Sequence, residues 1–373
     1  MQGAWRDVSY VQCPAATRAA SGLRRPRVSS RAHPFPRVSS ASGCTVPPRP
    51  RALHATTLAT ITLACAACAP PPEARGWECL APAAAGGGWD LTCRSVGQVL
   101  AELGLARGIV RTTNLPGAGG GVAFARAVTQ RNEDPSVLIA ASPSTTLRLA
   151  QGQYGDLTVN DVRWVGAIGA EYGILAVAAA SPLRTLDDVL AEWRRDPSSL
   201  VVSGGSAVAG QDHMKVLLLA DRTGIDPLRI RYVPFDGGGE AMTALLGGFV
   251  DVFSGEASEV EGQISAGRIR VLVTLAPERM EGPLASIPTA RESGVDLTWV
   301  TWRGFYVPGG IDDAQYQAWV DILTQVGRSS AWERARVTNR LQPFFMVGPE
   351  FAAFVEAQVE DFRAMSREIG LIE

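Results

Sequence analysis

Three glycine-rich turns are the part of this sequence best suited to chemistry, and the chemistry they suit is anion binding. They cover residues 82–90, 203–213 and 237–240. Each joins an expected strand to an expected helix, where backbone N–H groups lack partners and glycine lets a ligand approach closely. The helix dipole favours an anion at each start by about 0.3–1 kcal/mol. Two such starts facing each other could hold a carboxylate without any arginine, although each could also be an ordinary turn.

The main catalytic alternative is a hydrolase with Ser206 as nucleophile and His213 as base. His213 is the only histidine after residue 54, and the sequence has no Gly-x-Ser-x-Gly elbow. No cysteine or histidine cluster accompanies Asp212 and His213, so these two residues cannot make a metal site. A histidine in a first helical turn favours capping or packing. We therefore expect a protein that is not an enzyme and needs neither a metal nor a cofactor.

Nucleotide binding fits the sequence poorly. The phosphate-binding pattern Gly-x-x-x-x-Gly-Lys-[Ser/Thr] is absent, and the only lysine, Lys215, falls on an expected helix. The turn at residues 117–121 superficially resembles a dinucleotide-binding loop. Residues 137–146, however, lack the acidic residue that such a loop requires.

Four glutamates outside the glycine turns are predicted to be solvated or to cap helices: Glu171, Glu256, Glu259 and Glu261. Glu256 and Glu259 follow an expected strand end. A position at the rim of a ligand cleft is therefore the alternative for these two.

The charges are distributed unevenly along the 373 residues. Residues 1–51 contain nine arginines and one acid, Asp7, which leaves 26 basic and 36 acidic groups in the rest of the chain, a formal net charge of −10. An acidic body without a basic stripe argues against nucleic acid as a partner. An anionic ligand must therefore be attracted by local groups and not by the overall field.

The first 75 residues are predicted to be a leader and a signal region. Residues 1–45 are rich in arginine, serine and proline and lack apolar periodicity, so they cannot bury a core. We expect the true start near Val46. Twin-arginine export through Arg24-Arg25 is the weaker alternative, because the apolar region lies nearly thirty residues away.

Residues 52–68 are uncharged and resemble the apolar region of a signal peptide, since they are too few to span a bilayer. Small residues precede Cys65 and Cys68, which makes both cysteines candidates for lipidation. Ordinary secretory cleavage near Ala69 is the alternative. Either outcome places the protein in the periplasm or another extracytoplasmic space.

Cys79 and Cys93 are the cysteines that remain after the leader. In an oxidising compartment they are predicted to form a disulfide. Closing this loop would constrain the unfolded chain by roughly 3 kcal/mol. Two free buried thiols are the alternative.

From residue 76 onward, short apolar strands alternate with amphipathic helices, which is typical of parallel sheets covered on both faces. Strands are expected at residues 77–81, 109–114, 137–141, 200–203, 230–233, 250–253, 269–275 and 299–307, and an extended apolar run at 173–180. Helices are expected at residues 91–103, 185–195, 211–223, 239–246, 260–266, 312–327 and 349–369, with others ending near 131 and opening at 142–146. The helix at 185 begins with a capping-box pattern, Thr185 with Asp188.

These elements predict an α/β fold of two lobes joined by a hinge of two crossing strands, the layout of a type II periplasmic binding protein. The crossings are expected near residues 176–181 and 298–305, with Trp299 and Trp302 packing at the second. The expected lobes comprise residues 76–178 with 300–373, and residues 179–299.

A series of motifs runs in order through the same region. It comprises Glu78-Cys79, Gly86-Gly87-Gly88-Trp89-Asp90, Thr92-Cys93-Arg94, Asn114-Leu115-Pro116-Gly117, Ser203-Gly204-Gly205-Ser206, Gln211-Asp212-His213, Gly237-Gly238-Gly239-Glu240, Ile287-Pro288-Thr289 and Trp302-Arg303-Gly304. Together these motifs resemble the solute-binding subunits of tripartite tricarboxylate transporters, the Bug-type proteins. The cysteine pair and the Gly-Gly-Gly-Glu turn resemble the tricarboxylate-binding branch.

The resemblance implies a receptor that captures citrate, another tricarboxylate or a dicarboxylate between two loops and delivers it to separate membrane subunits. A receptor that reports its ligand to a sensor kinase is an alternative with the same fold. We expect a monomer. The resemblance, the glycine turns and the helix start at 142–146 give these candidate ligand-binding residues: Ala84, Gly86, Gly87, Gly88, Trp89, Asp90, Ser142, Ser144, Thr145, Ser203, Gly205, Ser206, Gln211, Asp212 and Gly238.

Overall fold

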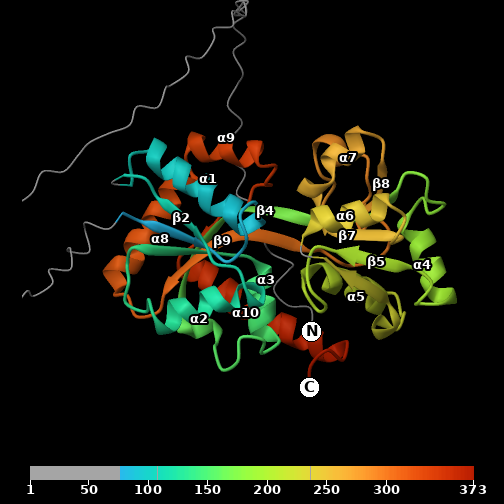
Figure 1. Ribbon diagram of the computed structural model, residues 1–373, viewed down its shortest axis with the longest axis horizontal. Coiled ribbons are helices and arrows are strands. Elements are labelled where there is room, and N and C mark those ends of the chain that lie inside the picture. Colours follow the sequence, from blue (N-terminus) through green and yellow to red (C-terminus); the bar gives the residue numbers. More distant parts are fainter. Residues whose placement is uncertain (1–75, 107, 236) are drawn as a thin grey trace, which may run out of the picture. The chain divides into compact units, whose positions relative to one another are not determined.

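The computed structural model describes residues 76–106, 108–235 and 237–373, and in these ranges strands and helices alternate along the chain as expected (Figure 1). The predictions for the leader, including lipidation at Cys65 or Cys68, lie outside the described residues.

The first sheet contains three parallel strands and two long antiparallel ones. Strand β1 (Glu78–Ala81) lies between β2 (Arg111–Asn114) and β3 (Val137–Ala141). Strand β9 (Val300–Pro308) pairs with β3 and with β4 (Val162–Ala178), and the short β10 (Met346–Val347) adds to β4. Because β1, β2 and β3 are parallel, the turns that follow them meet at one edge of the sheet.

The second sheet repeats this arrangement. Strand β5 (Val201–Gly204) is parallel to its neighbours β6 (Arg231–Pro234) and β7 (Val252–Glu256). Strand β4 pairs in antiparallel fashion with β7 and with β8 (Ile269–Thr274). The turns after β5, β6 and β7 therefore also share one edge.

Strand β4 belongs to both sheets and forms one of the two predicted crossings. Its residues 162–172 pair with β9, and its residues 173–178 pair with β7 and β8. The change of partner at Tyr172 and Gly173 falls a few residues before the predicted crossing. The second crossing is at Trp299, whose carbonyl accepts from Gly173 N–H at 3.2 Å and whose N–H donates to the Leu275 carbonyl at 2.8 Å.

Helices cover both faces of the two sheets (Figure 1). In the first sheet, α1 and α9 lie on one face and α2, α3 and α10 on the other; in the second, α6 and α7 lie opposite α5. The helices are α1 (Gly88–Glu102), α2 (Gly121–Thr129), α3 (Pro143–Ala150), α4 (Leu186–Arg195), α5 (Gln211–Arg222), α6 (Gly238–Leu246), α7 (Glu261–Ser265), α8 (Asp313–Gly327), α9 (Ser330–Thr338) and α10 (Pro349–Glu368).

Side-chain alternation along the strands explains why both faces need helices. Leu80 and Ile139 point into a core shared with α2, α3 and α10, whereas Cys79 and Leu138 point into a core shared with α1 and α8. Successive residues of a strand face opposite sides, so strands that are apolar throughout bury both faces.

The Cys79–Cys93 disulfide is confirmed, with the two Cα atoms 5.5 Å apart. It ties β1 to the second turn of α1 and so links the two elements that flank the first glycine turn. The capping box at Thr185 is also confirmed, since its hydroxyl accepts from Asp188 N–H and the Asp188 carboxylate accepts from Thr185 N–H.

Helix α9, the short strand β10 and the half of β4 at residues 162–172 were not predicted. Trp299 and Trp302 are buried in the core, as predicted for packing residues.

Within the described ranges, every helix is too short or too polar to cross a membrane.

Candidate ligand-binding site

The carboxylate of Asp90 holds the first glycine turn in place. Its Oδ2 accepts hydrogen bonds from Arg94 Nε and from Gly86 N–H, both at 2.9 Å. Its Oδ1 accepts from Asn114 Nδ2 at 2.9 Å, and the same amide group donates to the Ala83 carbonyl at 3.0 Å. These bonds, above all the one from Arg94, lower the pKa of Asp90 to about 2. Asp90, a predicted ligand contact, thus organises the turn.

We expect Asp90→Asn to lower the free energy of unfolding at pH 7 by about 2 kcal/mol, because a pKa of about 2 in the fold lies well below the ordinary value of about 3.9. A lowered pKa stabilises the fold above about pH 4, and this stabilisation is lost as the pH falls through about 2. Urea unfolding at pH 7 and near pH 2 measures both values. Asp187→Asn, an exposed acid in the first turn of α4, is the control. A deficit that is independent of pH would contradict the assignment.

The start of α1 is uncapped. Its N-cap is Gly87, which has no side chain to accept from the amides of the first helical turn. The first backbone hydrogen bond of the helix runs from Leu91 N–H to the Gly87 carbonyl at 3.0 Å. The amides of residues 88–90 therefore have no partner within the helix. These amides are the donors that an anion would need.

The start of α3 is built differently, because Ser142 caps it. The Ser142 hydroxyl accepts from Ser144 N–H at 3.3 Å. Ser142 and Thr145 are buried, and Ser144 is half-buried. Of the three predicted contacts here, Ser144 is therefore the most open to a ligand.

Ser206 and His213 are both engaged in holding the turn after β5. The Ser206 hydroxyl accepts from Asp212 N–H at 2.9 Å, and its carbonyl accepts from the Tyr232 hydroxyl at 2.7 Å. His213 stacks on Tyr232 with ring centres 4.3 Å apart, and its Nδ1 accepts from Ala209 N–H at 3.0 Å. Burial lowers the pKa of His213 to about 4. Among the described hydrogen bonds, none joins Ser206 to His213.

The other predicted residues of the second sheet differ in accessibility. Ser203 is fully buried, and its hydroxyl donates to the Val252 carbonyl at 3.4 Å, so it lies beneath the turn. Gly205 lies against the turn after β6, since a Cβ there would come within 2.3 Å of Gly238 N. Only glycine permits this contact between the two turns. Gln211 opens α5 and is half-buried.

The start of α6 already faces a carboxyl group of the chain itself, that of Glu259. A Cβ on Gly238 would lie 2.3 Å from Glu259 Oε1, and Glu259 Oε2 accepts from Glu256 N–H at 2.8 Å. Glu259 is exposed, so its carboxyl group also faces solvent. The predicted anion position at Gly238 is therefore next to an acidic side chain of the chain itself.

Beneath these turns lies a buried cluster of charges around Lys215. Its Nζ, which is fully buried, lies 2.8 Å from Asp212 Oδ1 and 3.0 Å from Glu256 Oε1, and donates to the Gly255 carbonyl at 2.8 Å. Thr301 donates to the same Glu256 oxygen at 3.0 Å. Although loss of hydration opposes it, attraction to Asp212 and Glu256 raises the pKa of Lys215. The cluster links α5, β7 and the crossing strand β9.

A second ion pair joins the two crossing strands beside the first glycine turn. Arg303 of β9 donates to Glu171 Oε1 of β4 from Nε at 3.0 Å and from Nη2 at 2.6 Å. The other Glu171 oxygen accepts from Ser258. The third guanidinium nitrogen, Nη1, would lie 2.7 Å from a Cβ on Gly88 and makes no hydrogen bond with the described residues. A cationic donor thus points at the uncapped start of α1.

The predicted residues fall into one group at each sheet, and hydrogen bonds connect the two sides. Gln151 at the end of α3 donates from Nε2 to the Ala209 carbonyl at 3.0 Å, and Ser258 donates to Glu171. The prediction that Glu171 is solvated or capping is wrong. Glu256 is not solvated either, although it is the N-cap of the short 3-10 helix Ala257–Glu259. Both are 4% exposed, because each is paired with a cation from another part of the chain.

Sequence reasoning missed Arg303 and Lys215 as part of the site. One signal for Lys215 was available, since a single lysine directly before the apolar run at residues 216–220 suggests a buried, paired charge. For Arg303 the signal was its position within an apolar strand. Neither signal identifies the partner.

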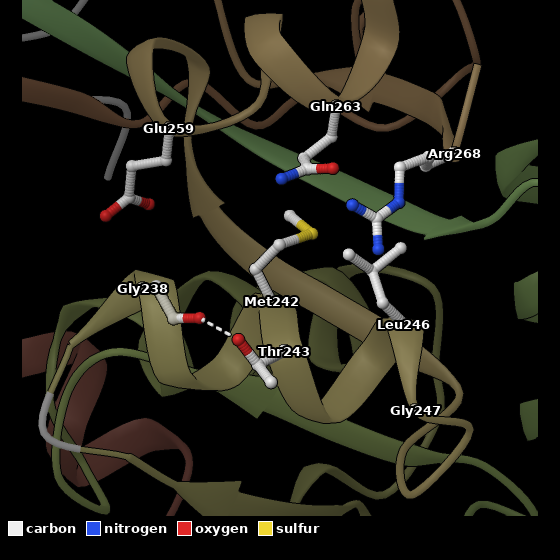
Figure 2. A pocket seen from close by; sticks show the side chains of 9 residues that line it. Gly238, Met242, Thr243, Leu246, Gly247, Glu259, Gln263 and Arg268 are labelled. Atoms are coloured by element: carbon white, nitrogen blue, oxygen red, sulfur yellow. Dashed lines mark hydrogen bonds between the residues drawn. The ribbon is translucent and has the colours of Figure 1, made fainter. Parts of the chain in front are cut away.

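A cavity of about 440 Å³ lies between α6 and α7 (Figure 2). Met242 and Leu246 line one side, Gln263 and Arg268 line the other, and Glu259 stands at one end. All the residues that line it come from the second sheet and its helices. The cavity is therefore separate from the turns of the first sheet. We do not assign the carboxylate of the predicted ligand to this cavity.

Comparison with known proteins identifies the family. Residues 94–371 match the model of the tripartite tricarboxylate transporter family receptor. Protein BugT of Bordetella pertussis is 24% identical over 317 residues, which are 84% of this chain and 95% of BugT. The UPF0065 protein in the gbd 5′ region of Cupriavidus necator is also 24% identical. That match covers 57% of this chain and 63% of the Cupriavidus protein.

Among solved structures, the R. palustris protein Rpa4515, determined with adipate, superposes with a TM-score of 0.70. It is 21% identical, and the match covers 80% of this chain and 98% of that protein. This likeness confirms the predicted two-lobed α/β fold with its hinge of two crossing strands.

The matched region spans most of the described chain and includes the turns after β2 to β7. Members of the matched family are periplasmic solute-binding proteins, which are not enzymes. This chain belongs to the tripartite tricarboxylate transporter receptor family.

Proposed function

We propose that this protein captures a di- or tricarboxylate outside the cytoplasm and delivers it to the membrane subunits of a tripartite tricarboxylate transporter. The observation that carries the proposal is the uncapped start of α1 beside the free Nη1 of Arg303. Amide donors at a helix start and a guanidinium group are both suited to a carboxylate.

In the proposed complex, one ligand carboxylate lies against the first glycine turn at residues 84–90. Amides at the start of α1 and Arg303 Nη1 donate to it. The turn at residues 203–212 approaches from the second sheet, with Ser206 and Asp212 shaping that turn through their mutual bond. Ser144, Gly205, Gln211 and Gly238 are the further proposed contacts.

The family match supports both the ligand class and the transporter partnership. The ligand of the similar Rpa4515 structure, adipate, is a dicarboxylate.

We propose lobes of residues 76–178 with 300–373 and of residues 179–299, a division supported by the change of strand partners within β4. A monomer in the periplasm, with a lipid anchor at Cys65 or Cys68, completes the proposal.

Calorimetric titration of the purified protein with citrate, succinate and adipate tests the ligand class. Saturable binding of one molecule per chain, with the acid recovered unchanged, is the expected result. Butyrate serves as the monocarboxylate control. If none of the acids binds, and if the protein instead hydrolyses a simple ester in a manner abolished by Ser206→Ala, the proposal is wrong.

A further inference from the structure

Arg148 is a buried arginine that has no acidic partner in the described part of the chain. It lies in the last turn of α3, and only 7% of its surface is exposed. Its Nη1 donates to the side-chain oxygen of Gln153. No ion pair formed within residues 76–373, as far as they are described, includes Arg148.

A buried guanidinium group such as that of Arg148 normally needs an anion as its counter-charge. Arginine is rarely buried unless it is paired, because a charge without a counter-charge loses its hydration at high cost. Loss of hydration accordingly lowers the pKa of Arg148, and the groups that oppose this are the hydroxyls of Tyr154 and Tyr232. Burial raises the pKa of both hydroxyls, so they are neutral at physiological pH and cannot balance the guanidinium charge.

On the side of the first sheet, Arg148 lies against the turn that precedes α2. A Cβ on Gly119 would lie 3.2 Å from Arg148 Nε, and the Gly119 carbonyl accepts from the Tyr154 hydroxyl at 2.7 Å. The next residue, Gly120, would bring a Cβ within 3.3 Å of the Trp89 ring. One short turn thus contacts both Arg148 and the start of α1.

On the side of the second sheet, the end of α3 meets the turn after β5. Three residues beyond Arg148, Gln151 donates to the Ala209 carbonyl at 3.0 Å. Tyr232 donates to the Ser206 carbonyl of the same turn at 2.7 Å. Arg148 therefore lies one helical turn from a contact between α3 and the turn after β5.

We propose that Arg148 is the subsite for a second carboxylate of the ligand and so selects di- and tricarboxylates over monocarboxylates. The proposal rests on the proposed function, in which the first carboxylate occupies the start of α1. The ligand supplies the counter-charge that the described chain does not provide, and the guanidinium fork suits a carboxylate.

Matched ligands isolate this second charge. Adipate and succinate are compared with their monomethyl esters, which keep the length but lose one charge, by calorimetry on the wild type, Arg148→Met and Arg148→Lys. Arg126→Met, an exposed arginine of α2, is the control. The wild type should bind each diacid about 10- to 100-fold more tightly than its monoester. Arg148→Met should abolish that preference, and Arg148→Lys should retain part of it.

Thermal unfolding without ligand provides a second readout. Because Arg148→Met removes an unbalanced buried charge, its unfolding midpoint should equal or exceed that of the wild type, whereas Arg126→Met should leave it unchanged. A wild type that binds diacid and monoester equally, or an Arg148→Met variant that keeps the preference, overturns the inference and leaves the proposed function intact. A wild type that binds no acid at all overturns both.

Discussion

Replacing Lys215 by methionine is expected to lower the free energy of unfolding at pH 7 by about 3–5 kcal/mol. The substitution leaves Asp212 and Glu256 buried without the cation that both contact, at 2.8 and 3.0 Å. Removing one partner of a buried ion pair costs more than the pair contributes, because an uncompensated charge remains. Urea unfolding followed by circular dichroism measures the loss.

A double variant and a change of pH test the cause. Adding Glu256→Gln to Lys215→Met removes one of the stranded charges and should restore part of the lost stability. Burial raises the pKa of Glu256, so this acid can be neutral in the fold as the pH falls toward about 4, where carboxylates also bind protons in the unfolded chain. The deficit of the single variant should therefore shrink at low pH. A deficit below 1 kcal/mol would mean that Lys215 is not the counter-charge of these acids.

The second large effect concerns Arg303 and ligand affinity. The double variant Arg303→Met with Glu171→Gln removes both members of the buried pair and should weaken carboxylate binding by about 10- to 100-fold while the fold is kept. The physical reason is loss of the charged donor beside the start of α1. Calorimetric titration gives the affinity, and thermal unfolding reports on the fold.

A substitution at Gly88 tests the same donor, Arg303 Nη1, by steric displacement. In Gly88→Ala the new Cβ would lie 2.7 Å from Arg303 Nη1, so the guanidinium must move and affinity should fall. Gly97→Ala is the matched control within α1, since its Cβ would lie no closer than 3.4 Å to Val110. Equal affinities of the two alanine variants would contradict a role for Arg303 in binding.

Local rules predicted the parallel strands and the helix starts well, because those elements are specified by neighbouring residues. The half of β4 at residues 162–172 was missed because Gly166 and Gly169 weaken a strand pattern. The structure gives the reason for both glycines. A Cβ on Gly166 would lie 2.6 Å from Val347 of β10, and one on Gly169 would lie 3.0 Å from Leu341. The glycines serve close packing that only the folded chain reveals.

The candidate site could be predicted only in its local parts. The glycine turns were visible because turn chemistry depends on a few adjacent residues. The ion pairs were not, since Lys215 and Glu256 are 41 residues apart and Arg303 and Glu171 are 132 apart. Glutamates that look solvated in isolation become buried when a distant cation neutralises them. For the same reason, the sequence gives no sign that Arg303 lies beside the first glycine turn or that Arg148 is buried.

A crystal structure of the protein with a bound di- or tricarboxylate tests the central claim most directly. We predict one carboxylate within hydrogen-bond distance of the amides of residues 88–90 and of Arg303 Nη1, held from the other side by the turn after β5. A ligand that binds elsewhere, with the start of α1 left to solvent, would contradict the account.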